Sequence, residues 1–107
     1  MTDALVVLTT VESQEDGERL AHALVEARLA ACVQILPPMT SVYRWQGAIE
    51  HAREHLLLVK TTRDAYPRLA AEIPALHPYQ TPELIALPVE NLSLEYWNWL
   101  TASLFEA

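Results

Sequence analysis

The feature that most constrains this chain is a pair of strand-forming segments joined by a turn at Trp45-Gln46-Gly47. Residues 39–45 lead into the turn, and residues 49–62 lead away from it. The first segment contains valine, tyrosine and tryptophan, and the second includes the apolar run Leu-Leu-Leu-Val. Strand-forming residues on both sides of a glycine turn predict an antiparallel β-hairpin.

The return strand of this hairpin is longer than a domain of this size can cover. A globule of about 100 residues has a diameter of roughly 34 Å, whereas a strand of about fourteen residues reaches ~46 Å. We therefore expect the hairpin to project from its own domain. The projecting part carries Val42, Tyr43, Trp45 and Ile49, whose apolar side chains are costly to leave in water. A closed, symmetric oligomer would cover them.

Hydrophobic periodicity predicts the other elements. Strands are expected at residues 4–11, 31–36 and 83–89, and helices at residues 14–29, 62–76 and after Ser93. Pro37 and Pro38 lack N–H donors, so the strand that they interrupt is expected at a sheet edge or at a bulge, not in the middle of a sheet. This order predicts one α+β domain over residues 1–107, a ferredoxin-like β-α-β-β-α-β sandwich with a long hairpin between its second and third strands and a C-terminal helix.

Three finer expectations concern burial and helix ends. In the return strand, the polar residues 50–55 are expected to be exposed, and the apolar residues 56–59 are expected inside the sheet. Pro74 is expected to end or kink its helix. The apolar side of the last helix is expected to consist of Leu94, Trp97, Leu100 and Leu104.

Composition and charge exclude several classes of function. The net charge is −7 and no basic cluster is present, which argues against nucleic-acid binding. The first residues do not resemble a signal peptide, and no apolar run approaches the ~20 residues of a membrane span. The single cysteine permits no intrachain disulfide and fits a reducing cytosol. We therefore expect a cytoplasmic protein that binds neither nucleic acid nor membrane.

Common catalytic motifs are absent from the sequence. It contains no HExxH, CxxC or GxSxG motif, and its two glycines form no phosphate-binding loop. We therefore expect a protein that is not an enzyme.

Several segments resemble one protein family, in order and over nearly the whole chain. They are Ala30-Ala31-Cys32-Val33, Ser41-Val42-Tyr43-x-Trp45-x-Gly47-x-Ile49-Glu50, Lys60-Thr61 and His77-Pro78-Tyr79-x-x-Pro82-Glu83-Leu84-Ile85. In these segments the chain is similar to the CutA family of divalent-cation-tolerance proteins. The resemblance implies a ferredoxin-like domain that forms a tight homotrimer through the long hairpin. It also implies a link to copper and other divalent cations, and a likeness to the PII signalling proteins.

Cys32 and His77 are the candidate metal ligands. A thiolate is a good soft ligand for Cu(I), and imidazole is the commonest metal ligand among side chains. Both residues also have ordinary interpretations, because a free cysteine packs as a small hydrophobe and a histidine at a helix end can bond the last carbonyls. Thr9 and Leu76 stand where some family members carry a further cysteine and histidine.

Gln34, Lys60, Tyr79 and Glu83 are the candidates for a ligand cleft. Lys60 is the only lysine in the chain, and it could either contact an anion or pair with an acid such as Glu83. Tyr79 lies in a loop stiffened by prolines, where it could line the same cleft or pack as an ordinary aromatic residue.

His51 and His55 share one face of the return strand. At ~13 Å apart they are too distant to bind one ion together, and we expect a solvated or interface-facing strip.

Three functions are compatible with these residues. The first is a trimeric protein of divalent-cation tolerance that binds copper or another metal ion, with Cys32 and His77 near one cleft. The second is a PII-like module that binds a small anionic ligand between subunits, near Gln34, Lys60 and Tyr79. The third is a structural trimer with no ligand of its own.

Overall fold

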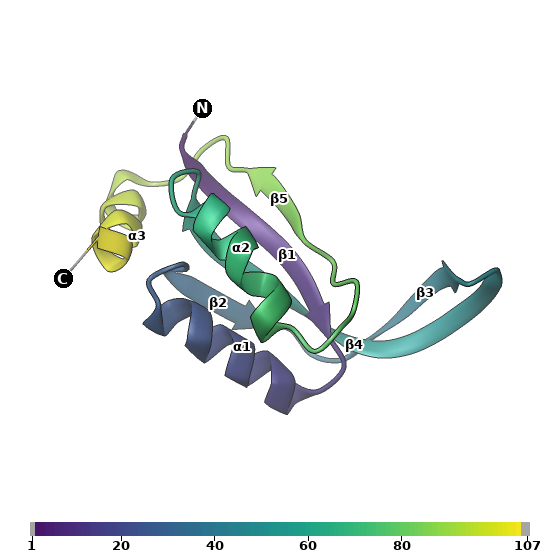
Figure 1. Cartoon of the computed structure of the whole chain (residues 1–107). Coiled ribbons are helices and arrows are strands. Elements are labelled where there is room, and N and C mark those ends of the chain that lie inside the picture. Colours follow the sequence, from purple (N-terminus) through teal and green to yellow (C-terminus); the bar gives the residue numbers. More distant parts are fainter. Residues whose placement is uncertain (1, 106–107) are drawn as a thin grey trace.

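A computed structural model describes residues 2–105 of the chain (Figure 1). The elements are β1 (Ala4–Val11), α1 (Gln14–Glu26), β2 (Cys32–Ile35), β3 (Met39–Trp45), β4 (Ala48–Thr62), α2 (Tyr66–Leu76), β5 (Ile85–Pro88) and α3 (Leu94–Phe105). The predicted ferredoxin-like order is confirmed, with the second strand divided into β2 and β3 at Pro37 and Pro38. No helix within residues 2–105 is long and apolar enough to cross a membrane.

All strand pairs in the sheet are antiparallel, and β4 pairs with three other strands, β1, β2 and β3. The strand order is β2-β4-β1-β5, and β3 pairs with the first part of β4. β2 and β5 therefore lie at the edges, as the sequence predicted. The two prolines fall between strands, where their missing N–H groups remove no hydrogen bond from the interior of the sheet.

The predicted projection of the hairpin is confirmed. β1 pairs with β4 only from His55 to Thr62, whereas β3 pairs with β4 from Ala48 to Glu54. The outer half of β4 and its partner β3 thus form a two-stranded ribbon that extends beyond the rest of the sheet (Figure 1). The molecule measures 45 × 26 × 24 Å as a result. At the tip, Gln46 (φ 50°) and Gly47 (φ 83°) both adopt the left-handed conformation that tight hairpin turns require.

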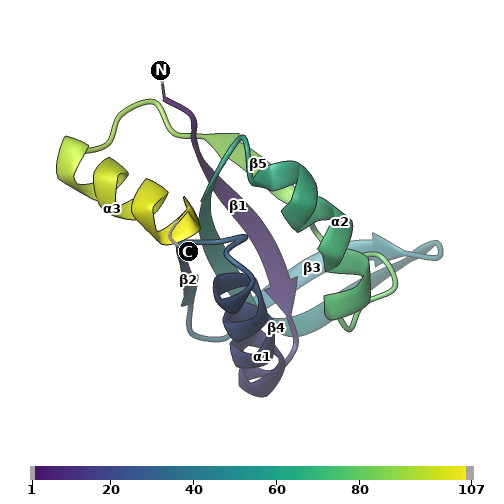
Figure 2. The same cartoon turned by 60° about the vertical axis from the view of Figure 1, so that its left-hand side comes forward.

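One face of the sheet is covered by α1 and α2 (Figure 2), and the core lies between these helices and the sheet. The strands contribute Val7, Val11, Leu57 and Val59, and the helices contribute Leu20, Leu24, Leu69 and Ile73. All of these side chains are at most 2% exposed. They recur at the two-residue period of a strand and at the three- and four-residue spacing of a helix, which is why the sequence placed them correctly.

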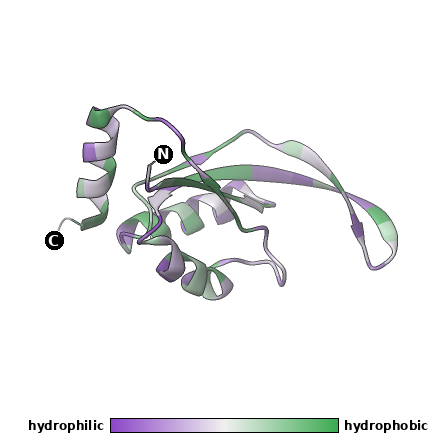
Figure 3. Ribbon diagram, turned by 90° about the horizontal axis from the view of Figure 1, so that it is seen from above, coloured by the Kyte–Doolittle hydropathy of each residue, from purple (hydrophilic) through white to green (hydrophobic). Residues whose placement is uncertain are grey.

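The opposite surface of the sheet, here called the open face, carries the residues that alternate with this core. Strand register places Val6 and Leu8 of β1 beside Lys60 and Leu58 of β4 on that face. At the β5 edge, Ile85 and Leu87 are 46% and 45% exposed. In the view from above, α3 and the hairpin lie at opposite ends of the molecule (Figure 3). Within residues 2–105, no helix covers the middle of the open face.

Two helix boundaries differ from the sequence prediction. α1 ends at Glu26 instead of residue 29, because Arg28 has a positive φ of 60° and the N–H groups of Leu29 and Ala30 both donate to Leu24 O. α2 begins at Tyr66 instead of residue 62, after a turn. Pro74 does not end the helix, which continues to Leu76.

The apolar side of α3 is narrower than predicted. Leu100 and Leu104 are buried against Ala31 and Ala65, and Trp97 packs beside them. Leu94, however, is 72% exposed.

Candidate functional site

A polar cluster lies at the α3 end of the open face and is called the Lys60 cluster. It consists of Cys32 and Gln34 on β2, Lys60 on β4 and Tyr96 on α3. Cys32 is the register partner of Lys60, so their side chains share a face. Lys60 Nζ donates to Gln34 Oε1 at 2.6 Å and lies 5.9 Å from the centroid of the Tyr96 ring. The cluster therefore holds an ammonium group between an amide oxygen and an aromatic face.

The half-buried thiol of Cys32 lies beside the Tyr96 hydroxyl. Burial raises the pKa of Tyr96, and the charge and hydrogen bonding of the Cys32 thiol raise it further. The phenol is thus held in its neutral form, as a donor to the sulfur or to a bound group.

No carboxylate within residues 2–105 lies within ion-pair distance of Lys60. The ion pairs found there join Arg19 to Asp16 and Arg63 to Asp3. The predicted alternative in which Lys60 pairs with Glu83 is therefore not realised within one chain. Glu83 lies at the other end of the molecule, beside the hairpin.

A second polar region, here called the hairpin groove, lies between the base of the hairpin and the loop that follows α2. It has a volume of about 1010 Å³. Its lining includes Glu12, Tyr43, Trp45, Glu54, Tyr79 and Glu83. The groove thus combines three aromatic residues with three carboxylates, and His51 and Arg53 also line it.

Glu54 is the buried member of the hairpin groove, only 8% exposed. The hydroxyl of Tyr79 donates to Glu54 Oε2 at 2.7 Å. Burial raises the pKa of Tyr79, and the acceptor and charge of Glu54 raise it further. The expectation that residues 50–55 are all exposed is wrong at this end of the segment. His55 is also 8% exposed, and its Nδ1 donates to Leu36 O at 2.8 Å.

His77 is buried on the helix-covered side of the sheet, with both ring nitrogens in hydrogen bonds. Its Nε2 donates to Thr10 O at 2.9 Å and lies 3.1 Å from Thr9 Oγ1. Its Nδ1 accepts from the Tyr79 N–H at 3.1 Å. This pattern defines the neutral tautomer that carries a proton on Nε2. Binding a metal ion at either nitrogen would break one of these bonds.

The structure does not bring the two predicted metal ligands together within one chain. Cys32 lies on the open face, whereas His77 contacts Thr9, which points into the core on the opposite face. The predicted ligand cleft is likewise divided. Gln34 and Lys60 belong to the Lys60 cluster, whereas Tyr79 and Glu83 line the hairpin groove.

The four predicted interface residues all lie on the projecting ribbon. Val42, Tyr43, Trp45 and Ile49 are 60%, 44%, 46% and 56% exposed. Tyr43 and Trp45 also line the hairpin groove. Exposed apolar side chains gathered in this way are typical of a surface that contacts another molecule.

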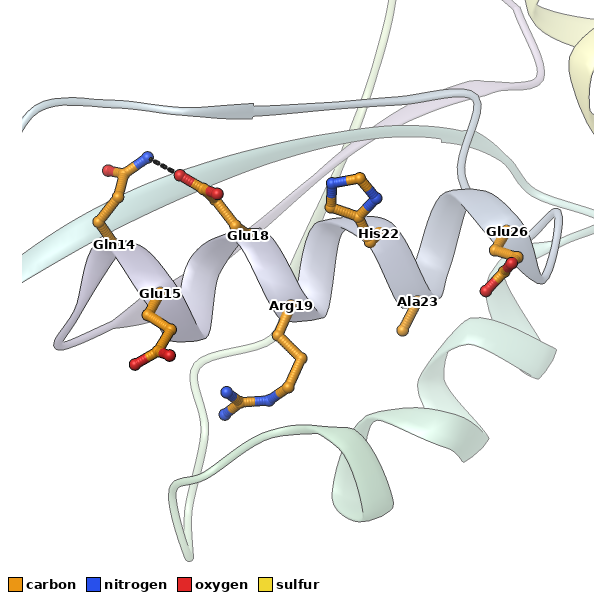
Figure 4. A pocket seen from close by; sticks show the side chains of 7 residues that line it. All are labelled: Gln14, Glu15, Glu18, Arg19, His22, Ala23 and Glu26. Atoms are coloured by element: carbon orange, nitrogen blue, oxygen red, sulfur yellow. Dashed lines mark hydrogen bonds between the residues drawn. The ribbon is translucent and has the colours of Figure 1, made fainter.

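A complete metal site is not formed by one copy of the chain. Within residues 2–105, no three His, Cys, Asp or Glu side chains are grouped closely enough to hold an ion. On α1, Glu15, Glu18, His22 and Glu26 spread along the helix and do not converge (Figure 4). Glu18 instead accepts a hydrogen bond from Gln14 Nε2 at 2.9 Å.

Two residues of these sites were not singled out from the sequence. Glu54 is separated from Leu56, Leu58 and Lys60 by even numbers of residues along β4. The alternation of side chains in a strand could therefore have placed it on the open face with them. Tyr96 follows the helix cap by three residues, and no local pattern shows that its ring reaches β2 and β4.

Comparison with known proteins assigns this fold and these motifs to one family. The family of CutA1 divalent ion tolerance proteins matches residues 5–103. The divalent-cation tolerance protein CutA of Thermus thermophilus is 55% identical over 95 residues, covering 89% of this chain and 92% of that protein. A chloroplastic CutA 1 protein of rice is 40% identical over 104 residues, which cover 97% of this chain and 59% of the rice protein.

Solved structures agree. CutA from Xylella fastidiosa is 38% identical and superposes with a TM-score of 0.93, covering 96% of this chain and 99% of that one. The solved structure of the Thermus thermophilus protein superposes with a TM-score of 0.87 at 54% identity, over 91% of this chain and 94% of that one. The chain belongs to the CutA family of divalent-cation tolerance proteins.

The hydrogen bonds of His77 generate a prediction about pH. Burial lowers the pKa of His77 below its usual 6.5, although the Thr10 carbonyl and the carboxylates of Asp16 and Glu54 oppose this shift. Below about pH 6.5 the unfolded chain therefore binds a proton that the folded chain resists, so the free energy of unfolding falls. Urea titrations from pH 7.5 to 5 should show this decrease.

The variant His77→Gln should show a smaller decrease than the wild type over the same pH range. His22→Gln, which changes an exposed histidine on α1, is the matched control and should retain the full decrease. An equal pH dependence in wild type and His77→Gln would contradict the assignment of a neutral, buried imidazole.

Proposed function

We propose that the chain acts in divalent-cation tolerance as a homotrimer, without catalysis, and that copper is the ion it binds. Membership of the CutA family supports the link to divalent cations. The assembly is supported by the geometry of the chain itself. The metal proposal depends on this trimer.

The observation that supports assembly is that apolar side chains are exposed on the hairpin ribbon and at the β5 edge of the open face. The ribbon exposes Val42, Tyr43, Trp45 and Ile49, and the open face exposes Ile85 and Leu87 at its edge. A two-stranded hairpin is at best marginally stable alone in water. A ring of identical subunits covers both surfaces and leaves no strand edge free for uncontrolled pairing.

Light scattering at micromolar concentration should give a mass three times the 12.0 kDa of one chain. The double variant Val42→Glu/Ile49→Glu places charges on the ribbon and should lower the mass to that of a monomer, because burying unpaired carboxylates is unfavourable. Val25→Glu, at an exposed apolar position on α1, is the matched control and should leave the trimer intact. A monomeric wild-type protein would exclude the proposal.

Within the trimer we assign Cys32 as the copper ligand. Its thiol is half-buried on the open face, next to the polar side chains of the Lys60 cluster. A soft thiolate suits Cu(I). One chain offers no grouped partner ligands within residues 2–105, so the remaining ligands must come from other subunits or from solvent. His77 was the other candidate, but its buried ring is held by the backbone on both nitrogens.

Titration of the trimer with Cu(I) against a competing chelator should reveal binding at no more than one ion per chain. Cys32→Ala should weaken binding by about tenfold or more, which is a loss of about 1.4 kcal/mol or more. His22→Ala, which removes an exposed imidazole, should leave the affinity unchanged. Equal affinities in wild type and Cys32→Ala would rule out Cys32 as the ligand.

A second candidate function, a PII-like small-molecule module, is favoured by one observation. The ammonium group of Lys60 contacts Gln34 and Tyr96 but no carboxylate within residues 2–105. A partly buried cation of this kind is suited to hold an anion.

A thermal-shift screen of nucleotides and organic acids tests this second candidate. A ligand should raise the melting temperature of the wild type and have no effect on Lys60→Gln. Arg68→Gln removes an exposed positive charge on α2 and should respond like the wild type. A flat response across the whole screen would remove the support for this function.

A further inference from the structure

Two oppositely charged groups at opposite ends of the open face lack a counter-charge. Glu54 is only 8% exposed, and its hydrogen-bond donor among residues 2–105 is the neutral hydroxyl of Tyr79. Lys60 donates to the neutral oxygen of Gln34. Neither group belongs to an ion pair within the described part of the chain. A buried charge without a partner is unfavourable, so Glu54 is incomplete in a single copy. Lys60 is only partly buried, and its ammonium group can accept a counter-charge from another molecule.

The two groups cannot reach each other within one chain. They lie six positions apart on the same strand and the same face, a separation of about 20 Å at ~3.3 Å per residue. Leu56 and Leu58 lie between them on β4, and Val6 and Leu8 lie beside these on β1. The open face is thus an apolar strip with an anion at one end and a cation at the other.

We propose that this charged strip sets the docking register between copies of the chain, with Lys60 of one subunit paired with Glu54 of the next. This inference rests on the trimer proposed above. In a cyclic trimer every interface joins two different surfaces, which allows the cationic end of one subunit to face the acidic end of its neighbour. Opposite charges brought together in this way fix the register of an interface and reject other arrangements.

The pairing completes a site that one chain does not hold. Gln34 and Lys60 of one subunit come beside Tyr79 and Glu54 of the next. Three of the four residues that the sequence suggested for a single cleft, Gln34, Lys60 and Tyr79, are thereby brought together across the interface. The phenol of Tyr79 is kept neutral by its own burial and by the hydrogen bond and charge of Glu54, so it remains a donor to the carboxylate in the assembled pair.

A second copy of the chain explains more than a soluble anion does. A bound anion would neutralise Lys60 but would leave Glu54 without a cation and the apolar strip in water. A second copy supplies both counter-charges and covers Leu56, Leu58 and their neighbours in the same contact. Charge complementarity and apolar area therefore favour the same occupant.

A double-mutant cycle on the trimer tests the pairing. The variants are Lys60→Gln, Glu54→Gln and the two together, and the readout is the dissociation midpoint in a dilution series followed by light scattering. Each single variant should weaken assembly by about tenfold or more. The double variant should be no weaker than the weaker single variant, because the partner that a single change leaves unpaired has also been removed.

The reversed pair Lys60→Glu/Glu54→Lys provides an independent measurement. It should assemble better than either of its single changes, since each interface again contains opposite charges. Arg68→Gln and Glu72→Gln, exposed charges on α2, are the matched controls and should leave the midpoint unchanged. Circular dichroism confirms that each variant is folded before it is scored.

A failure of the trimer proposal and a failure of the Lys60–Glu54 pairing give different results. A monomeric wild type would remove the trimer itself. A trimeric wild type in which the two glutamine changes have additive effects would refute the pairing alone. Strengthened assembly with added citrate or nucleotide in the wild type but not in Lys60→Gln would show that a soluble anion occupies Lys60, which would also overturn the inference.

Discussion

The rest of the structure depends on the mismatch between β4 and the sheet that contains it. From His55 to Thr62 this strand is flanked by β1 and supports the core, whereas from Ala48 to Glu54 it has β3 as its only neighbour in the sheet. A strand that continues past its sheet must carry its hydrogen bonds and apolar side chains into solvent or into another molecule. The same strand also carries Glu54 and Lys60, so its length determines both the shape of the subunit and the separation of its two unpaired charges.

In the proposed trimer, the polar groups that could bind a ligand lie on the same face that contacts other subunits. The thiol of Cys32 and the ammonium group of Lys60 lie on the face that the helices leave open. The hairpin groove, with its buried carboxylate, lies at the far end of that face. A single chain presents these groups about 20 Å apart and incomplete. The proposed trimer places them at subunit boundaries, where ligands from two chains can combine, and this explains why one chain contains no grouped metal ligands within residues 2–105.

The sequence predicted the fold well because the fold follows from periodic patterns. The core positions Val7, Leu57 and Leu24 recur at strand and helix spacing, and the turn at Gly47 has the positive φ that glycine favours. The length of residues 49–62 alone predicted the projecting hairpin. These features are local, or depend on spacing along a single element, so one sequence is enough to reveal them.

The sites were harder to predict because they depend on contacts between distant segments. Glu54 looked like part of a solvated run, but the loop after α2 folds over it and Tyr79 supplies its hydrogen bond. His77 was a candidate metal ligand or helix-end residue, but the same fold aims its ring at Thr10 O. Lys60 and Glu83 seemed able to pair, but strand register separates them. Polarity along the sequence does not show which loop or helix will cover a given side chain.

Amide hydrogen exchange on the hairpin tests the central claim, that the outer half of β4 and all of β3 are covered by other copies of the chain. In an isolated subunit, residues 39–54 form a two-stranded ribbon that opens readily, so their amides exchange quickly. If the ribbon is buried between subunits, its protection should approach that of β1 at micromolar concentration and fall when the protein is diluted below its dissociation midpoint. Rapid exchange over residues 39–54 at every concentration, with β1 still protected, would contradict the account.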